Sequence, residues 1–334
     1  MDTKIIDSGV ANDISYSKMR RIWTLRNYRT ELLMLGVLIV MCVIVSFISP
    51  YFFQKSNFLN IFSQQATTGF MAIGMTLVII TGGIDLSVGT LLGFSGMLAA
   101  IELSNGGNIF LAILYSMGIC LLIGVINGYL VGYIKMPAFI VTLGTQQICQ
   151  SMNYVVSGGM SASHFPDAFA FIGKGKIIGS FPFYLFVMLV IYGVLIFVLS
   201  KMRFGRFLYA TGSNEEAARL SGVNTKRVIM STYIISAITA GLAGLVMVSR
   251  LMACDPTYGK SGEMDVIAAV VIGGTAMSGG KGSLWGTLVG VLIVGVLRNA
   301  LNLMGINTFW QGTAIGAVII LAVLAEQLSH KKVG

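Results

Sequence analysis

Hydrophobic residues are gathered along the chain into long runs, and short polar segments separate one run from the next. An α-helix needs about 20 apolar residues to cross the hydrocarbon core of a bilayer, and most of the runs are about this long. The pattern therefore predicts an all-α, polytopic membrane protein with about ten transmembrane helices. The predicted spans are residues 31–49, 60–81, 86–103, 109–133, 137–156, 182–200, 228–250, 264–277, 284–303 and 308–326.

The composition agrees with one integral membrane domain. Hydrophobic residues make up 55% of the 334 residues and charged residues only 10%, far outside the range of soluble globular domains. We divide the chain into a polar, basic cytoplasmic tail over residues 1–30 and a single membrane domain over residues 31–328, and we expect the tail to lie near anionic lipid. The formal charge of +9 reflects basic residues in cytoplasmic loops, so we expect no nucleic-acid partner.

The basic residues also set the predicted orientation. With the N-terminus inside, sixteen Lys and Arg residues fall in cytoplasmic segments and six fall elsewhere. Because Lys and Arg are concentrated in cytoplasmic loops, we expect both termini in the cytoplasm. This orientation places the loop 201–228 in the cytoplasm and the loop 157–181 outside.

The segment 201–228 is the longest charged interior segment and the best candidate for a cytoplasmic working surface. Ser213 is followed three residues later by Glu216, which predicts a capping box at the start of a short helix. Gly222 is placed to end this helix in a left-handed conformation. The pattern predicts a helix of about two turns.

Within this short helix, Glu215 and Arg219 have the i,i+4 spacing of a supporting ion pair. The predicted apolar contacts of the helix are Ala217, Ala218 and Leu220. Two interpretations stay open: a solvated loop helix between two spans, and a coupling helix that lies in a groove of a motor subunit.

Two glycine-rich segments interrupt the hydrophobic pattern, and each continues into similar sequence, Gly-Thr-Leu-Leu-Gly after the first and Gly-Thr-Leu-Val-Gly after the second. The similarity suggests an internal repeat, and the predicted topology opens both segments to the same side. The candidate gate and pathway residues are Gly82, Gly83, Asp85 and Ser87 in the first segment and Gly273, Gly274, Gly279, Gly280 and Lys281 in the second.

Glycine allows backbones to approach closely and allows a helix to stop at membrane depth. Each glycine-rich segment is therefore either a tight cytoplasmic turn, with Asp85 or Ser87 capping the next helix, or a broken helix whose end gates or lines a pathway. A charge at mid-membrane costs about 2.5 to 3.5 kcal/mol, so we expect Asp85 to be capped, paired or hydrated.

Several G-x-x-x-G spacings permit close contact between helices, and we expect most of them to serve packing within the chain. They are Gly89/Gly93, Gly124/Gly128/Gly132, Gly286/Gly290 and Gly312/Gly316.

The residue types needed for catalysis are scarce. The only histidines are His164 and His330, and neither a nucleophile with its base nor a metal cluster can be named, so we expect no catalytic residue, metal or bound cofactor. The segment 279–282 lacks the spacing of a phosphate loop, so ATP is expected on a partner. Few acidic residues fall within spans, which disfavours an ion-coupled secondary transporter; that reading remains the alternative, and a membrane enzyme is third.

Three motifs in register resemble the permease subunits of ribose-type ABC sugar importers, in the branched-chain amino acid/ribose-type permease family. The resemblance covers nearly the whole chain from Glu31 to Ala325. The motifs are Gly-Gly-Ile-Asp-Leu-Ser-Val-Gly over 82–89, Asn-Glu-Glu-Ala-Ala-Arg-Leu-Ser-Gly over 214–222, and Ala-Ala-Val-Val-Ile-Gly-Gly-Thr over 268–275 through Gly-Gly-Lys-Gly over 279–282.

The resemblance implies a multi-pass permease of the bacterial inner membrane. It further implies a second permease copy, most simply a homodimer, a cytoplasmic ATPase that binds the ATP, and an external binding protein that delivers a monosaccharide such as ribose. Transport is then expected to alternate between inward and outward access as the ATPase binds and hydrolyses ATP.

Carried over residue by residue, the resemblance assigns coupling to the ATPase to the loop helix and gating to the two glycine-rich segments. It assigns contact with the binding protein to Arg250–Asp265, where Cys254 and Met264 depart from the family pattern. Ser213 also departs, because the family often has glycine there. The coupling residues are Ser213, Asn214, Glu215, Glu216, Ala217, Ala218, Arg219 and Gly222.

Overall fold

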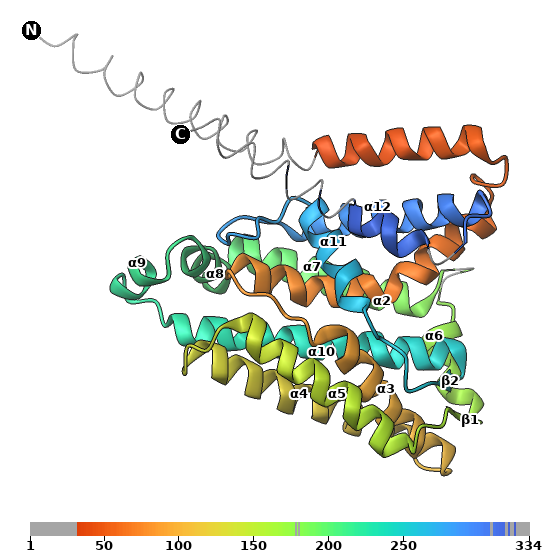
Figure 1. Ribbon diagram of the computed structural model, residues 1–334, viewed down its shortest axis with the longest axis horizontal. Helices are drawn as coiled ribbons and strands as arrows, with labels where there is room; N and C mark the ends of the chain where they lie inside the picture. Colours follow the sequence, from red (N-terminus) through yellow and green to blue (C-terminus); the bar gives the residue numbers. More distant parts are fainter. Residues whose placement is uncertain are drawn as a thin grey trace, which may run out of the picture.

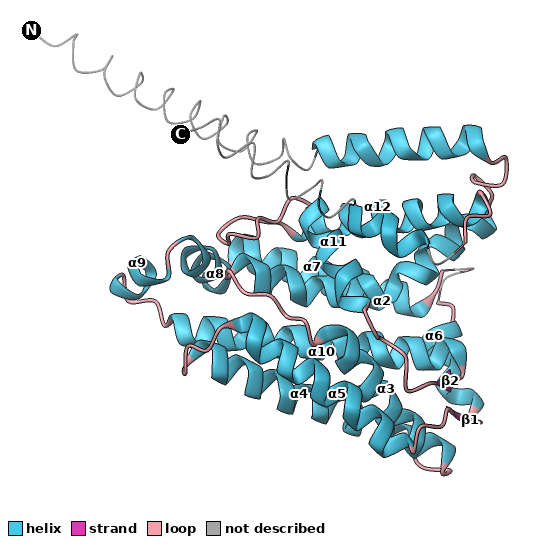
Figure 2. Ribbon diagram, in the orientation of Figure 1, coloured by secondary structure: helices cyan, strands magenta, loops and turns pink. Residues whose placement is uncertain are grey.

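Helices account for nearly all of the regular structure in the computed structural model, which describes residues 32–177, 179, 181–307, 310–317, 320 and 324. The predicted all-α class is confirmed (Figure 2). The helices are Leu32–Ile48, α2 (Lys55–Ile80), α3 (Val88–Ser104), α4 (Ile109–Gly132), α5 (Ala138–Ser157), the 3-10 turn η1 (Asp167–Phe169), α6 (Ala170–Lys174), α7 (Phe183–Lys201), α8 (Arg203–Ser213), α9 (Glu215–Leu220), α10 (Thr225–Leu251), α11 (Gly262–Ile272) and α12 (Leu284–Leu303), and the strands are β1 (Ala162–Ser163) and β2 (Ala253–Cys254).

Nine of the ten predicted spans coincide with a helix. The tenth, 308–326, lies partly outside the described residues, as does the tail 1–30 entirely. Within the described part of the chain, α4, α7, α10 and α12 are each long and apolar enough to cross a membrane alone. By contrast, α11 has 11 residues. At about 1.5 Å per residue it covers only about half of a 30 Å hydrocarbon core.

The long helix α10 is the axis around which α2, α3 and α4 pack, and glycines allow these backbones to approach it. A Cβ at Gly74 of α2 would lie 2.3 Å from the Cα of Ser236, and a Cβ at Gly124 of α4 would lie 2.9 Å from the Cα of Ile234. Helices in a bilayer gain little hydrophobic free energy when they associate, so close backbone packing of this kind supplies much of the stabilisation. The main core therefore lies along α10, among the buried apolar side chains of α2, α3 and α11.

The G-x-x-x-G spacings serve packing within the chain at three of the four places, as predicted. The glycines of α4 face α10, those of α3 face the segment before α11, and those of α12 face α11. Gly312 and Gly316 are different, because a Cβ at either position would meet no atom within 4 Å among the described residues.

Two connections run extended into the middle of the helical layer instead of turning tightly at its edge (Figures 1 and 2). After α2 the chain turns at Gly82 (φ 81°) and runs alongside α10 until Asp85 meets Ser236, the twelfth of the 27 residues of α10. At the other end, the strand β2 pairs antiparallel with β1, and the chain then returns inward to α11. Each of α3 and α11 is consequently a half-helix that begins at mid-depth.

The first turns of these two half-helices meet. A Cβ at Gly89 in α3 would lie 2.5 Å from the carbonyl oxygen of Gly259 and 3.1 Å from the amide nitrogen of Glu263. The first glycine-rich segment is therefore not a tight turn at the surface, whereas the second connects the end of α11 to the start of α12 beside the end of α2. The molecule thus has an α9 end, where α8 and α9 lie, and a sheet end, where β1 and β2 lie (Figure 1).

We predict that Gly74→Ala destabilises the protein, because the added methyl group would overlap the backbone of α10. Overpacking of this kind costs about 1 to 3 kcal/mol. Thermal unfolding of the purified protein should show a lower Tm for this variant. The matched control is Gly193→Ala in α7, where a Cβ meets nothing within 4 Å, and equal Tm values for the two variants would refute the packing argument.

Candidate functional site

The predicted coupling helix is present as α9, but it begins one residue later than predicted. Asn214 is the N-cap residue: its backbone is extended and its side-chain oxygen accepts from the amide of Ala217 at 2.9 Å. Ser213 is instead the last residue of α8, and its hydroxyl donates to the carbonyl of Tyr209 at 2.8 Å. The predicted Ser213–Glu216 capping box is wrong, because α8 holds Ser213 in a helical conformation that an N-cap cannot have.

The acidic residues of α9 also have partners other than those predicted. Arg219 pairs with Glu216, with its Nε 3.1 Å from Oε2, and not with Glu215. The guanidinium of Arg219 lowers the pKa of the Glu216 carboxyl, so this exposed pair stays charged at neutral pH. After the helix, Gly222 has φ 83° and ends it in the left-handed conformation that was predicted.

Glu215 connects α9 to two other elements. Its carboxylate forms an ion pair with Lys135, in the connection between α4 and α5, and accepts from the hydroxyl of Thr225 at the start of α10 (2.9 Å). Lys135 has φ 64°, a conformation that costs a non-glycine residue about 1 to 2 kcal/mol and that marks a position held by its surroundings. Sequence reasoning did not single out Lys135, and the available signal was a lone basic residue between two apolar runs.

The outer surface of α9 is free within the described structure. Ala218 is 5% exposed and packs inward, but Leu220 is 76% exposed and Ala217 is exposed as well. Of the three predicted apolar contacts of the helix, only Ala218 packs within the chain. An exposed leucine beside a charged pair is a surface suited to a protein partner.

The two glycine-rich segments meet at the end of α8, which agrees with the prediction that both open to the same side of the membrane. The amide of Gly280 donates to the carbonyl of Ile80 at 2.8 Å, and a Cβ at Gly212 would lie only 1.7 Å from that carbonyl oxygen. Gly279 (φ 83°) lies against Gly82 in the same contact. The end of α8 is therefore joined by backbone to both candidate gate segments.

The other predicted gate residues lie around this contact or above it. Gly83 lies beside the ring of Tyr233, and Gly273 lies against the carbonyl of Gly286 in α12. Gly274 has φ 86° at the point where α11 ends. The side chain of Lys281 is exposed.

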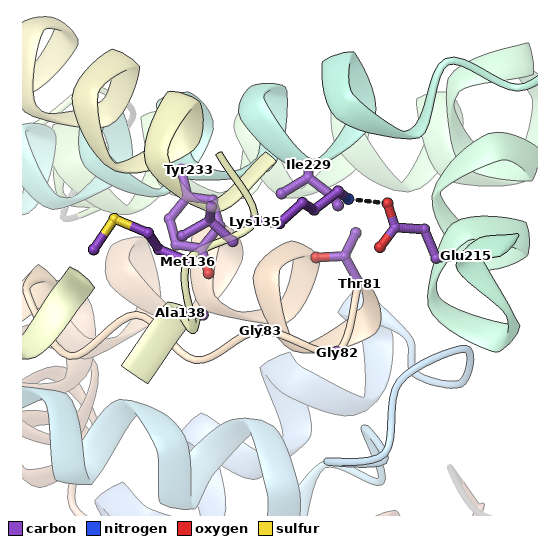
Figure 3. Close-up of a pocket in the computed structure, with 10 residues that line it drawn as sticks. Thr81, Gly82, Gly83, Lys135, Met136, Ala138, Glu215, Ile229 and Tyr233 are labelled. Carbon is purple, nitrogen blue, oxygen red and sulfur yellow. Dashed lines mark hydrogen bonds and ion pairs between the residues drawn. The ribbon is translucent and has the colours of Figure 1, made fainter. Parts of the chain in front are cut away.

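A cavity of about 240 Å³ lies between α9, α10, the end of α2 and the connection from α4 to α5. Figure 3 shows the Lys135–Glu215 pair beside Thr81 at this cavity. The buried hydroxyl of Tyr233 also lines it and has no hydrogen-bond partner among the described residues. The cavity leaves room for α9 to move relative to α2 and α10.

Asp85 is 1% exposed and is held by hydrogen bonds. One carboxylate oxygen accepts from the amide (3.0 Å) and hydroxyl (2.6 Å) of Ser87, and the other accepts from the hydroxyl of Ser236 (2.8 Å). Asp85 was expected to be capped, paired or hydrated, and the hydrogen bonds from Ser87 and Ser236 cap its carboxylate. Asp85 thereby fixes the start of α3 to the middle of α10.

Of the predicted outer segment Arg250–Asp265, the part around β2 lies at the sheet end, and the rest returns inward to the first turn of α11. Asp255 accepts from the hydroxyls of Ser161 and Thr257, both at 2.6 Å, and these bonds lower its pKa. Asp265 in α11 forms an ion pair with Arg298 of α12 at 2.6 Å. The sheet end and the α9 end lie at opposite ends of the long helices (Figure 1).

A family model described as the permease component of the branched-chain amino acid transport system matches residues 57–323. The chain belongs to this permease family. It is 42% identical to the ribose import permease protein RbsC of Haemophilus influenzae over 300 residues, covering 88% of this chain and 93% of the relative. It is 41% identical to RbsC of Bacillus subtilis over 292 residues (87% and 90%) and 36% identical to the D-allose transport system permease protein AlsC of Escherichia coli over 302 residues (89% and 92%). No solved structure gives a match.

These matches confirm the predicted relationship to ribose-type permeases, and they describe a permease subunit rather than an enzyme. The protein is accordingly a multi-pass protein of the inner membrane.

We predict that Asp85→Ala lowers the Tm more than Asp85→Asn does. Asparagine keeps an acceptor for Ser87, whereas alanine leaves buried donors of Ser87 and Ser236 unpaired at about 1 to 3 kcal/mol each. Thermal unfolding should therefore rank the Tm values as wild type, then Asn, then Ala. If asparagine is as damaging as alanine, the retained acceptor is not sufficient and the carboxylate itself is needed for stability.

Proposed function

We propose that this permease forms the translocation pathway for a monosaccharide, ribose or a similar sugar, in an ATP-binding cassette importer. The observation that carries this proposal is the identity of about 40% to ribose import permeases over nearly the full length of both chains. The D-allose relative, at a lower identity, shows why the sugar is named as a class.

The proposed complex contains two copies of this chain, a cytoplasmic ATPase and an external binding protein. The chain itself binds no cofactor, and ATP is bound and hydrolysed by the ATPase. About ten spans place both termini and the α9 end in the cytoplasm and the sheet end outside, an orientation that rests on the distribution of basic residues. The part of segment 250–265 that lies at the sheet end then receives the binding protein.

In this scheme α8 and α9, within the cytoplasmic loop 201–228, couple the ATPase to the spans. The exposed side chains of Glu216, Arg219 and Leu220 form the docking surface. Movement of the ATPase is passed on at two places: the backbone contact of Gly212 with Ile80 and Gly280, and the pair of Glu215 with Lys135. The glycine-rich segments 82–87 and 273–281 are the gate that these contacts move.

The function is tested by uptake of radiolabelled ribose and a panel of monosaccharides in cells that carry the permease, the ATPase and the binding protein. Uptake should disappear when any one of the three is removed. Uptake that persists without the ATPase would overturn the proposal and favour an ion-coupled transporter.

We predict that Leu220→Asp and Glu216→Lys each lower ATPase association at least tenfold in a pull-down, about 1.4 kcal/mol of binding free energy. Both side chains are exposed in the isolated permease, so the Tm should not change. The control is Lys174→Ala at the sheet end. If both variants retain association and uptake, α9 is a solvated loop helix.

We further predict that Lys135→Glu lowers uptake several-fold without lowering ATPase association, because it breaks the link between α9 and the α4–α5 connection. The double variant Lys135→Glu with Glu215→Lys should recover most of the uptake by restoring an ion pair in the reverse order. Recovery of uptake in the double variant would show that the two residues act as a pair. If the double variant instead loses as much uptake as the two single variants together, the two residues act independently.

A further inference from the structure

The cavity between α9, α10, the end of α2 and the connection from α4 to α5 has the lining of a small-molecule site. Its volume of about 240 Å³ is far larger than the space of about 10 to 15 Å³ that one water molecule needs. Ligand pockets typically combine apolar walls with a few polar groups. Here the apolar lining residues are Val131, Met136, Ala138 and Ile229, and the polar ones are Thr81, Lys135, Glu215 and Tyr233 (Figure 3).

The hydroxyl of Tyr233 is the group in this lining that most needs a partner. Tyr233 is 1% exposed, and its hydroxyl has no hydrogen-bond partner among the described residues. A Cβ at Gly83 would lie 2.5 Å from the hydroxyl oxygen, so this hydroxyl lies directly against the first glycine-rich segment. A buried hydroxyl that stays unpaired destabilises the protein, and a ligand that bonds to it removes that cost.

Tyr192 in α7 shows how a tyrosine hydroxyl is used when its role is structural. It is 2% exposed, and its hydroxyl donates to the carbonyl of Gly69 in α2 at 3.1 Å. Tyr192 and Tyr233 are therefore buried to the same degree and differ in what their hydroxyls meet. The hydroxyl of Tyr192 bonds to a neighbouring helix, and the hydroxyl of Tyr233 belongs to the lining of a cavity.

The other polar groups of the lining indicate an uncharged ligand. Lys135 and Glu215 pair with each other, so together they add no net charge. Glu215 uses Oε1 for Lys135 and for the hydroxyl of Thr225, and its Oε2 is a further acceptor. The Thr81 hydroxyl donates to the carbonyl of Val78 at 2.8 Å and can still accept. Sugar hydroxyls both donate and accept, which matches this set, whereas a buried net charge would lack a counter-charge.

We propose that this cavity is a regulatory site for an uncharged monosaccharide, the imported sugar itself, on the cytoplasmic side. The inference rests on the proposed function and adds to it inhibition by the product. The lining comes from α9, α10, the end of α2 and the α4–α5 connection, the elements whose relative movement the proposed coupling requires. A ligand that binds one arrangement of these elements shifts the population toward that arrangement, so sugar in the cytoplasm should slow transport.

Thermal unfolding of the purified permease–ATPase complex, without the binding protein, tests the site. A ribose concentration series should raise the Tm of wild type and of Tyr192→Phe, and raise that of Tyr233→Phe several-fold less. Without ribose, Tyr192→Phe should have a lower Tm than wild type because it loses a hydrogen bond, and Tyr233→Phe should not. Sugars also stabilise proteins by exclusion from the surface, but that contribution is common to all three proteins.

A second variant tests the same site without removing a polar group. Ala138→Leu puts a larger side chain into the cavity, so it should also reduce the ribose-induced rise in Tm several-fold. An equal rise in wild type, Tyr233→Phe and Ala138→Leu would overturn the site. An equal rise with the charged sugar acid gluconate would overturn the assignment to an uncharged ligand.

Proteoliposomes test the regulation. The complex is reconstituted with ATP inside and with the binding protein and radiolabelled ribose outside, and the initial uptake rate is measured with and without unlabelled ribose inside. Internal ribose should slow uptake several-fold in wild type and in Tyr192→Phe, and much less in Tyr233→Phe. The same ratio of the two rates in all three proteins would overturn the regulatory role. The unfolding measurement does not depend on transport, so failure of the site and failure of the proposed function are distinguishable.

Discussion

The hydrogen bond from the Gly280 amide to the Ile80 carbonyl holds together the segments on which the proposed coupling depends. It joins the end of α2 to the loop after α11, and Gly212 packs against the same carbonyl so closely that no side chain fits there. Ile80 is fully buried, and an unpaired buried carbonyl is costly, so this hydrogen bond stabilises the contact. The end of α8 is therefore connected directly to both half-helix segments.

The same constraint on backbone polar groups explains why α5 is polar. Two extended segments enter the helical layer, and their carbonyls lack the partners that a helix would supply. Thr142 bonds to Ile84, and Gln150 and Asn153 bond to Pro256, so one helix supports both segments. Asp85 has the corresponding role for donors, because it accepts from Ser87 and Ser236 and holds the start of α3 against α10. Polar residues that look functional in the sequence are thus partly structural.

Hydrophobic runs were sufficient to place nine helices, because a run of apolar residues is the direct requirement of a membrane helix. They were not sufficient to identify half-helices: residues 264–277 and 284–303 are both apolar, but α11 stops after 11 residues and α12 continues for 20. The prediction of an N-cap at Ser213 was wrong because α8 extends through that residue. The partner of Glu215 was not predictable, because Lys135 is distant in sequence and only the packing of α4 against α10 brings it close.

The two links from α9 into the spans differ in physical character, and this difference bears on how coupling can work. The contact at Gly212 is made by backbone atoms and leaves no room for a side chain, so in the proposed mechanism α8 and the glycine-rich segments would move as one body. The Lys135–Glu215 pair is partly exposed, and pairs of this kind contribute at most about 1 kcal/mol. Such a pair can break and reform within a transport cycle, and the adjoining cavity provides the space for it. In the proposed mechanism, a rigid link combined with an adjustable one would allow α9 to drive the gate while the connection between α4 and α5 changes its position.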